Sequence, residues 1–285
     1  MKGKKYENIF KSSPGGVRID HIMGLIDPFV YSTNEPHMTD NNSGRLYSSV
    51  YSPVLGQYAK HSVEEFANIL EKIVLPAAEK YGVTRDKIIC EDLGEVTPVA
   101  REVLNKLDVL GLAVTEFDYS GADAWHNKVI MLGSHDNPSF IEFTDYLYND
   151  PNKGRFDYKT HVLASDTVTP SEDVNVYREQ IRGDKKKYMA SSFAELFTSP
   201  AKKVQIFFTD FFGIGKTYNH PGESKDCWEL RVPENYDDLY YKNLKEGLAF
   251  NLPEAIARAI RHRGQAEQNS ELLESLDSFS SILKE

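Results

Sequence analysis

Short apolar segments alternate with amphipathic helical patterns along most of this chain, and that alternation limits the fold more than any other feature. Five segments have strand character, being short, apolar and mostly rich in β-branched residues: 17–20, 87–90, 112–115, 129–132 and 204–208. Stretches with helical spacing separate them. Strands that alternate with helices are typical of α/β proteins with a largely parallel sheet, and we predict this class.

The first long predicted helix has clear signals at both ends. Ser62 and Glu65 form a capping-box pattern, in which each residue's side chain bonds the backbone of the other. Gly82 marks the end of the helix. Pro76 lies inside the pattern and should kink or interrupt the helix, because proline cannot donate the backbone hydrogen bond.

Three further helices follow from similar signals. Thr97 before Pro98 predicts an N-cap and a first helical residue, and the helix continues to Leu107. A late helix covers 253–262. The tail, 265–285, has apolar residues at helical spacing, which predicts a helix docked on the domain.

Two segments read as long irregular loops because they are rich in Asn, Ser, Pro and Gly. They cover 31–61 and 146–184. Loops of this length in a compact domain often form binding sites or lids. Plain surface insertions are the alternative for each of them.

Composition narrows the classes of partner. The formal net charge of −10 argues against nucleic acid, whose phosphates require clustered Lys and Arg. No apolar run approaches the roughly 18 residues of a membrane span, so we expect no membrane partner. The basic N-terminus lacks the apolar stretch of a signal peptide. A neutral substrate fits this composition better.

The two cysteines, Cys90 and Cys227, are too few for a disulfide framework. Cys90 lies inside an apolar strand pattern, and we interpret both as packing residues. A reduced, cytoplasmic setting is therefore the expected location.

Acidic residues follow three of the predicted strands. In a parallel α/β fold, sites form where strands end and loops leave the sheet. Arg18 and Asp20 share one face of the first strand, since side chains alternate along a strand. They would point away from the apolar face, as a functional pair or as a structural ion pair at the strand end.

Glu91 and Asp92 follow the second strand. Alternation sends their side chains to opposite sides, so only one of them can share a site with Asp20. The alternative is that either carboxylate only caps the following turn. Acids delivered by different strands to one rim are the usual construction of a barrel active site.

The third acid, Asp136, stands in the polar segment 133–137 after an apolar strand. His135 could instead ligate a metal together with Asp20, His21 and Asp136. No His-x-His or His-Glu-x-x-His spacing supports this alternative. We therefore expect neither a metal nor another cofactor.

These segments resemble glycoside hydrolase family 77, the amylomaltases or disproportionating enzymes. The matching segments occur in the family's order: VRIDHIMGL (17–25), CEDLGEVTP (90–98), GSHDN (133–137), TDFFGIG (209–215), YNHPG (218–222) and CWELR (227–231). The resemblance implies a 4-α-glucanotransferase that moves α-1,4-glucan segments between maltodextrins or pieces of starch or glycogen. It also implies a retaining mechanism, which requires two carboxylates about 5–5.5 Å apart.

The resemblance also implies roles for individual residues. Asp20 would be the nucleophile, Glu91 the general acid/base, and Asp136 the acid that stabilises the transition state. Arg18 would keep Asp20 ionised, and His135 would hydrogen-bond sugar hydroxyls. In supporting roles we add four candidates for substrate contact, the first two from the loop after the first strand: Tyr47, Tyr51, Trp228 and Arg231.

Family members are considerably longer before the nucleophile than this chain. We therefore expect residues 1–264 to form the C-terminal portion of a TIM (β/α)8 barrel with long βα loops and without its first strands. Residues 265–285 would be a helical tail. A missing N-terminal barrel half is an expected partner, and the activity of this chain by itself is an open question.

Two other functions remain open at the level of the sequence. A catalytically silent glucan-binding fragment would use the same cleft without turnover. An α-glucan hydrolase would use the same three acids, with water in place of the acceptor sugar. The acids alone do not distinguish these functions.

Overall fold

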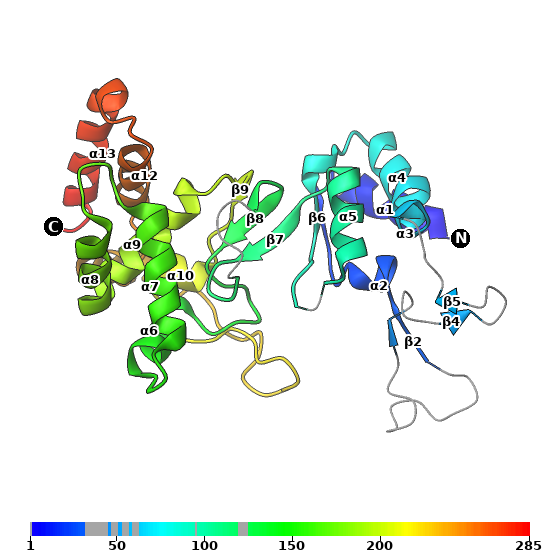
Figure 1. Ribbon diagram of the computed structural model, residues 1–285, viewed down its shortest axis with the longest axis horizontal. Coiled ribbons are helices and arrows are strands. Elements are labelled where there is room, and N and C mark those ends of the chain that lie inside the picture. The colour runs from blue at the N-terminus through cyan, green and yellow to red at the C-terminus, as the bar shows by residue number, and fades with distance from the viewer. Residues whose placement is uncertain are drawn as a thin grey trace. The chain divides into compact units, whose positions relative to one another are not determined.

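The computed structural model describes residues 2–31, 45–46, 51–52, 57–58, 63–94, 96–118 and 125–285. It divides into two compact units, Met1–Leu112 and Ala113–Glu285, which are described separately below. Both contain helices and short strands, so the α/β class is confirmed (Figure 1).

The first unit is built on a parallel strand pair. Strand β1 (Val17–Ile19) pairs with β6 (Ile88–Cys90), with Val17 opposite Ile88 and Ile19 opposite Cys90. A parallel bridge joins Ile89 to Leu110, just before β7 (Gly111–Val114). Both predicted strands are confirmed. Their shared direction places their C-terminal ends at one edge.

Helices cover one face of this pair. Val17 and Ile19 are half-buried against a core that includes Phe10, Leu70 and Val103, whereas Arg18 faces the other way. Alternation along the strand causes this division. The helices of this unit are α1 (Lys2–Ser12), α2 (Met23–Ile26), α3 (Val63–Ile69), α4 (Leu75–Lys80) and α5 (Pro98–Leu107), with a 3-10 turn at Arg85–Lys87.

The segment predicted as an irregular loop at 31–61 contains short strands in its described parts. Strand β2 (Phe29–Val30) pairs antiparallel with β3 (Arg45–Leu46). Strand β4 (Tyr51–Ser52) pairs antiparallel with β5 (Gln57–Tyr58).

Pro76 interrupts its helix as predicted. A π-helical turn, Leu70–Val74, separates α3 from α4, and Pro76 lies in the first turn of α4. At that position the missing N–H is harmless, and the wider turn before it accommodates the ring. The residue predicted to cap α3, Ser62, lies outside the described residues. Thr97 caps α5 as predicted, because its hydroxyl accepts a hydrogen bond from Ala100 N at 3.4 Å.

The second unit has a three-stranded sheet in the order β7, β8 (Lys128–Met131), β9 (Lys203–Val204). Strand β8 pairs in parallel with β9. The predicted strands in this unit are confirmed, but the last one is shorter than expected. Residues from Phe208 onward form helix α10 (Phe208–Phe212) instead.

The prediction of a long loop at 146–184 is wrong. Helix α6 (Phe140–Asn149) enters this segment, and α7 (Gly154–Thr167) and α8 (Val174–Gly183) fill most of it. Each helix buries apolar residues at helical spacing, such as Tyr177 and Ile181 on α8. The turn-forming residues are concentrated in the two short connections, so they describe the helix ends rather than a loop.

Helix α9 (Lys185–Thr198) packs against α12 (Leu252–His262) and α7 at the centre of this unit (Figure 1). The late helix is therefore confirmed as α12. The other helices are α11 (Tyr236–Lys245), a 3-10 turn at Glu267–Asn269, and α13 (Ser270–Ile282). Division of the chain into 1–264 and 265–285 remains a prediction.

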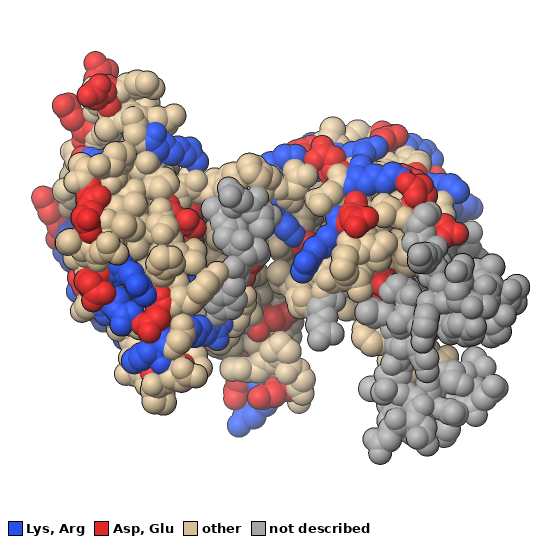
Figure 2. Space-filling model, viewed as in Figure 1, with Lys and Arg blue, Asp and Glu red and all other residues tan. Residues whose placement is uncertain are grey.

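Basic and acidic side chains are interspersed over each unit on the face shown in Figure 2. Among the described residues, no helix has both the length and the apolar character needed to cross a membrane.

Candidate active site

Arg18 and Asp20 form an ion pair on the face of β1 that points away from the helices. Arg18 Nη1 lies 2.7 Å from Asp20 Oδ1, and the side chains are 37% and 76% exposed. An ion pair this accessible contributes only about 0–1 kcal/mol to stability. Its exposure leaves Asp20 open to a substrate.

Glu91, directly after β6, faces the same guanidinium. Glu91 Oε2 lies 3.6 Å from Arg18 Nη2 and accepts a hydrogen bond from His21 N at 2.6 Å. The backbone hydrogen bonds between β1 and β6 continue past the ends of both strands. Glu91 N donates to Ile19 O, and Ile22 N donates to Glu91 O. One arginine therefore contacts two carboxylates at one end of a parallel strand pair.

Asp92 lies on the opposite side, as alternation predicted. It is buried, and its Oδ1 accepts a hydrogen bond from Leu112 N at 2.7 Å. Asp92 therefore has a structural role, because its carboxylate holds the start of β7. Of the two adjacent acids, Glu91 is the one that shares a site with Asp20.

The position of His21 was not predicted. Its φ of 44° lies in the left-handed region, which non-glycine residues rarely adopt. This conformation accompanies the bond that its N–H donates to Glu91. Sequence reasoning considered His21 only as a metal ligand, and no group of three or more His, Cys, Asp or Glu within the described residues is arranged to hold a metal.

In the second unit, Asp136 has a partner for each carboxylate oxygen. His135 Nε2 lies 3.2 Å from Asp136 Oδ2, and Asn219 Nδ2 donates to Asp136 Oδ1 at 2.5 Å. The loop that carries them is closed by Asn137, whose Oδ1 accepts bonds from the backbone and hydroxyl of Ser134. Asp136 is therefore fixed in orientation and still 43% exposed.

Trp228 lies beside this group. Its ring is 5.3 Å from the ring of His135 and 5.3 Å from that of Tyr218, the latter in an edge arrangement. Trp228 is 51% exposed, and Arg231 Nη1 donates to its carbonyl at 2.7 Å. An exposed indole held between two rings is a suitable platform for the apolar face of a sugar.

Asn219 and Tyr218 are site residues that sequence reasoning missed. Both belong to the segment YNHPG, which was recognised as matching without a role for either residue. Tyr47 lies outside the described residues. Tyr51 belongs to β4, opposite Tyr58, and the structure describes its backbone alone.

Buried acids lie beneath the loop of Asp136, and these too were missed. Glu116, two residues after β7, lies so close to Gly133 that a Cβ on Gly133 would be 3.2 Å from Glu116 Oε2. Burial, with a contribution from the charge of Asp210, raises the pKa of Glu116 well above its usual range. The signal was available in the sequence, since an acid, Glu116, directly follows the predicted strand 112–115.

Asp210 anchors the other end of the same loop. Its Oδ1 accepts a hydrogen bond from Phe140 N at 3.1 Å, at the start of α6. Burial raises the pKa of Asp210 to about 7. Two buried acids thus bracket the segment that carries His135 and Asp136.

A third buried acid, Glu195, and the buried Lys159 line a small cavity of about 10 Å³ with Glu116. Burial raises the pKa of Glu195 to about 7 and lowers the pKa of Lys159. Such a volume is about the size of one water molecule. The interior beneath the loop is therefore polar and tightly packed.

Comparison with known proteins identifies the family. Residues 10–236 match the model of glycoside hydrolase family 77, described as 4-alpha-glucanotransferase. The chain belongs to the 4-alpha-glucanotransferase family. All nine residues selected from the sequence fall within the matched range.

Relatives of this family are longer than the chain. It is 26% identical over 170 residues to 4-alpha-glucanotransferase DPE1, chloroplastic/amyloplastic, of Arabidopsis thaliana, covering 55% of this chain and 26% of the relative. The chain thus spans about a quarter of that protein's length.

Two solved amylomaltase structures share the fold. Amylomaltase from Corynebacterium glutamicum has a TM-score of 0.58 and 19% identity, covering 91% of this chain and 38% of that one. Amylomaltase from Streptococcus agalactiae, solved in complex with acarbose, has a TM-score of 0.51 and 16% identity, covering 86% and 44%.

Proposed function

We propose that this chain acts in 4-α-glucan transfer, with Asp20 as nucleophile, Glu91 as general acid/base and Asp136 as the third acid. The observation that carries the proposal is the guanidinium of Arg18, which contacts both Asp20 and Glu91. A retaining reaction needs two neighbouring carboxyl groups with different tasks.

In the first step, Asp20 attacks the anomeric carbon while Glu91 donates a proton to the departing glycosidic oxygen. The bond between that oxygen and the anomeric carbon breaks, and a glycosyl ester forms on Asp20. In the second step, Glu91 accepts the proton of another glucan's 4-hydroxyl, which attacks the ester. Asp20 leaves as a carboxylate, and the configuration of the sugar is retained.

Residues of the second unit would bind and orient sugar. His135 and Asp136 offer hydrogen-bonding groups for hydroxyls, and Trp228 offers an exposed ring face. The substrates we propose are α-1,4-glucans, namely maltodextrins and fragments of starch or glycogen. Their lack of charge suits a chain whose own net charge is −10.

We also propose that the strands of this chain belong to a (β/α)8 barrel, with an N-terminal barrel half as a partner. The parallel pairs β1–β6 and β8–β9 and the fold of longer amylomaltases support this proposal. A cytoplasmic location is proposed as well, supported by two buried free thiols, Cys90 and Cys227.

The test is incubation with maltotriose, followed by chromatography of the products. One sample contains the purified chain alone, and a second contains the chain with the polypeptide encoded immediately upstream. Transfer gives both shorter and longer oligosaccharides. Maltotriose left unchanged in both samples would show that the proposal is wrong, and glucose without longer products would select a hydrolase.

The Asp20→Asn variant separates chemistry from binding. We expect transfer to fall on the order of a thousandfold or more, because the amide is a poor nucleophile. Glu102→Gln, at an exposed position on α5, is the matched control and should keep full activity. Full activity in Asp20→Asn would show that Asp20 is not the nucleophile.

A further inference from the structure

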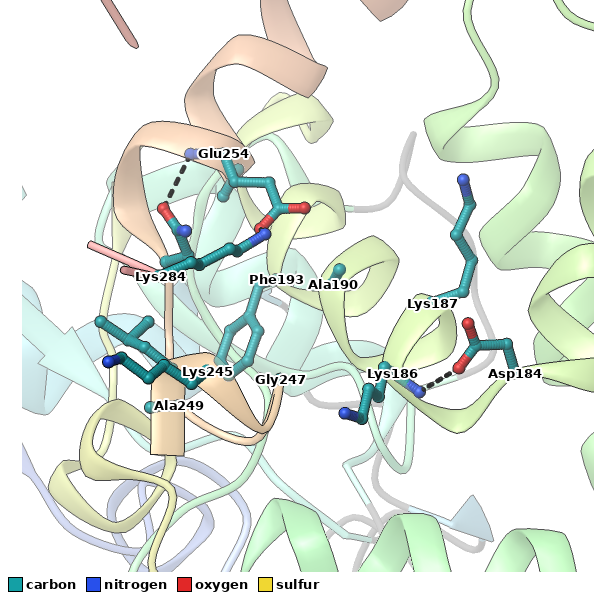
Figure 3. A pocket seen from close by; sticks show the side chains of 13 residues that line it. Asp184, Lys186, Lys187, Ala190, Phe193, Lys245, Gly247, Ala249, Glu254 and Lys284 are labelled. Atoms are coloured by element: carbon teal, nitrogen blue, oxygen red, sulfur yellow. Dashed lines mark hydrogen bonds and ion pairs between the residues drawn. The ribbon is translucent and has the colours of Figure 1, made fainter. Parts of the chain in front are cut away.

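A pocket of about 240 Å³ in the second unit lies outside the candidate active site. The start of α9, the end of α11 and the start of α12 form its walls. Figure 3 shows the side chains that line it. No part of the proposed glucan transfer uses these residues.

Positive charge is concentrated at this pocket. Four lysines line it, at positions 186, 187, 245 and 284, together with two acids, Asp184 and Glu254. The chain as a whole has ten more acidic than basic residues. The pocket therefore has an excess of two positive side chains, although the chain as a whole is negatively charged.

The two acids are already engaged. Glu254 pairs with Lys284 at 2.7 Å, and Asp184 caps α9 by accepting a hydrogen bond from Lys186 N. Lys187 lies over the ring of Tyr177, 5.1 Å from its centroid. Within the described part of the chain, the ammonium groups of Lys186 and Lys245 have no ion-pair partner.

The sequence at the start of α9 is unfavourable for the helix itself. Residues 185–187 are three lysines in the first turn, where the helix dipole already places partial positive charge. Lys185 is paired with Asp145, but Lys186 is not paired. Asp184 already supplies one carboxylate at this helix end, but three lysines outnumber it, and the unpaired Lys186 favours an anionic ligand.

The floor of the pocket is apolar. It consists of Phe193, Leu244, Ala249 and Ala255, all of which are buried. Lys186 and Lys245 lie on either side of Gly247 (Figure 3). A Cβ on Gly247 would lie 3.1 Å from the Lys186 stem, so the glycine provides space for this stem.

We propose that this pocket binds a compact phosphate monoester, with the phosphate between Lys186 and Lys245 and an apolar group on the floor. A phosphate monoester carries about −1.5 to −2 charges at pH 7, which matches the excess of two lysines. Drug-sized ligands occupy roughly 300–1,000 Å³, so this pocket suits a smaller molecule.

The test is calorimetry of the full chain, without glucan, using phenyl phosphate as the probe. We expect phenyl phosphate to bind more tightly than inorganic phosphate, because inorganic phosphate cannot use the apolar floor. Benzyl alcohol, which lacks the charge, should not bind. Binding should weaken as salt is raised, since the lysines are exposed. Equal binding of inorganic phosphate would overturn the proposal.

Variants locate the binding site. Lys186→Ala/Lys245→Ala should weaken phenyl phosphate binding at least about tenfold, through loss of two charged donors. Lys242→Ala is the matched control, because Lys242 is also exposed in the last turn of α11 and does not line the pocket.

Unchanged binding in Lys186→Ala/Lys245→Ala would place the phosphate elsewhere and overturn the proposal. Maltotriose transfer by these variants should equal that of the parent chain, so failure here is separate from failure of the proposed function.

Discussion

At the scale of single residues, Arg18 is the group on which the first unit's candidate site depends. Its two terminal nitrogens contact different carboxylates, at 2.7 Å for Asp20 and 3.6 Å for Glu91. A lysine has one terminal nitrogen and cannot reproduce this fork. The arginine therefore sets the relation between the two acids as well as their charge balance.

Replacement of Arg18 by lysine tests this role. We expect Arg18→Lys to lower kcat/KM for maltotriose transfer about tenfold or more, because one carboxylate loses its contact. The melting temperature should change little, because the pair is exposed. Arg101→Lys, at an exposed position on α5, is the control. A variant as active as the parent would contradict the assigned role.

Asp210 gives a prediction about pH. Its pKa is about 7 in the folded chain against an ordinary 3.8, so the folded state keeps the proton that the unfolded state loses above pH 4. Rising pH therefore favours unfolding across the window from about 4 to 7. The effect can reach a few kcal/mol, at roughly 1.4 kcal/mol for each unit of pKa shift.

Asp210→Asn should remove this dependence, because the amide has no proton to lose and its oxygen can still accept from Phe140 N. Relative to the parent, the variant should become more stable as pH rises from 4 to 7 in urea unfolding. Asp237→Asn, at an exposed position, is the control. A constant difference between variant and parent over this range would contradict the prediction.

At the scale of helices and strands, the features that could be predicted are mostly those that depend on neighbouring residues in the sequence. Thr97 and Pro98 act on their own helix start, so their effect can be read from adjacent residues. The acids after β1 and β6 were found because strand alternation is also local. The pairing of β1 with β6 joins residues far apart in the sequence, and the site depends on it.

The failures at this scale have physical causes. Helices α7 and α8 were hidden by turn-forming residues in short connections, although their buried residues have helical spacing. Glu116 was overlooked because its importance comes from its closeness to Gly133, in the loop that follows another strand. Asn219 was overlooked because its partner, Asp136, is distant in the sequence.

The cap of α5 provides a test at this scale. Thr97→Ala should lower the free energy of unfolding by about 1 kcal/mol, because the N–H of Ala100 loses its acceptor. Thr97→Ser keeps a hydroxyl and should retain most of the stability. Chemical denaturation measures both. Equal loss in the two variants would show that the hydroxyl contributes nothing.

At the scale of the whole molecule, each unit has its own hydrophobic core. Leu107 is buried in a core of the first unit, and Ile181 is buried in a core of the second. Cores that share no residues can lose stability separately. The stability of the chain is therefore better described for each unit than by a single value.

Hydrogen exchange tests this independence. Leu107→Ala and Ile181→Ala should each destabilise their own unit by about 2–5 kcal/mol, through loss of buried volume. Leu107→Ala should speed exchange in α3 and α5, and Ile181→Ala should speed exchange in α8 and α9. Uniform acceleration along the whole chain in both variants would show that the two cores unfold together.

The arginine shared by two carboxylates has a consequence for the order of events in the proposed reaction. Before the first step Glu91 carries the proton and Asp20 is the anion; once the sugar is esterified to Asp20, Glu91 has given up its proton and becomes the anionic neighbour of the Arg18 guanidinium. Its attraction then falls wholly on Glu91, at the stage when Glu91 must accept a proton. A single fixed cation can thus serve as counter-ion to each acid in turn, without any movement of the backbone.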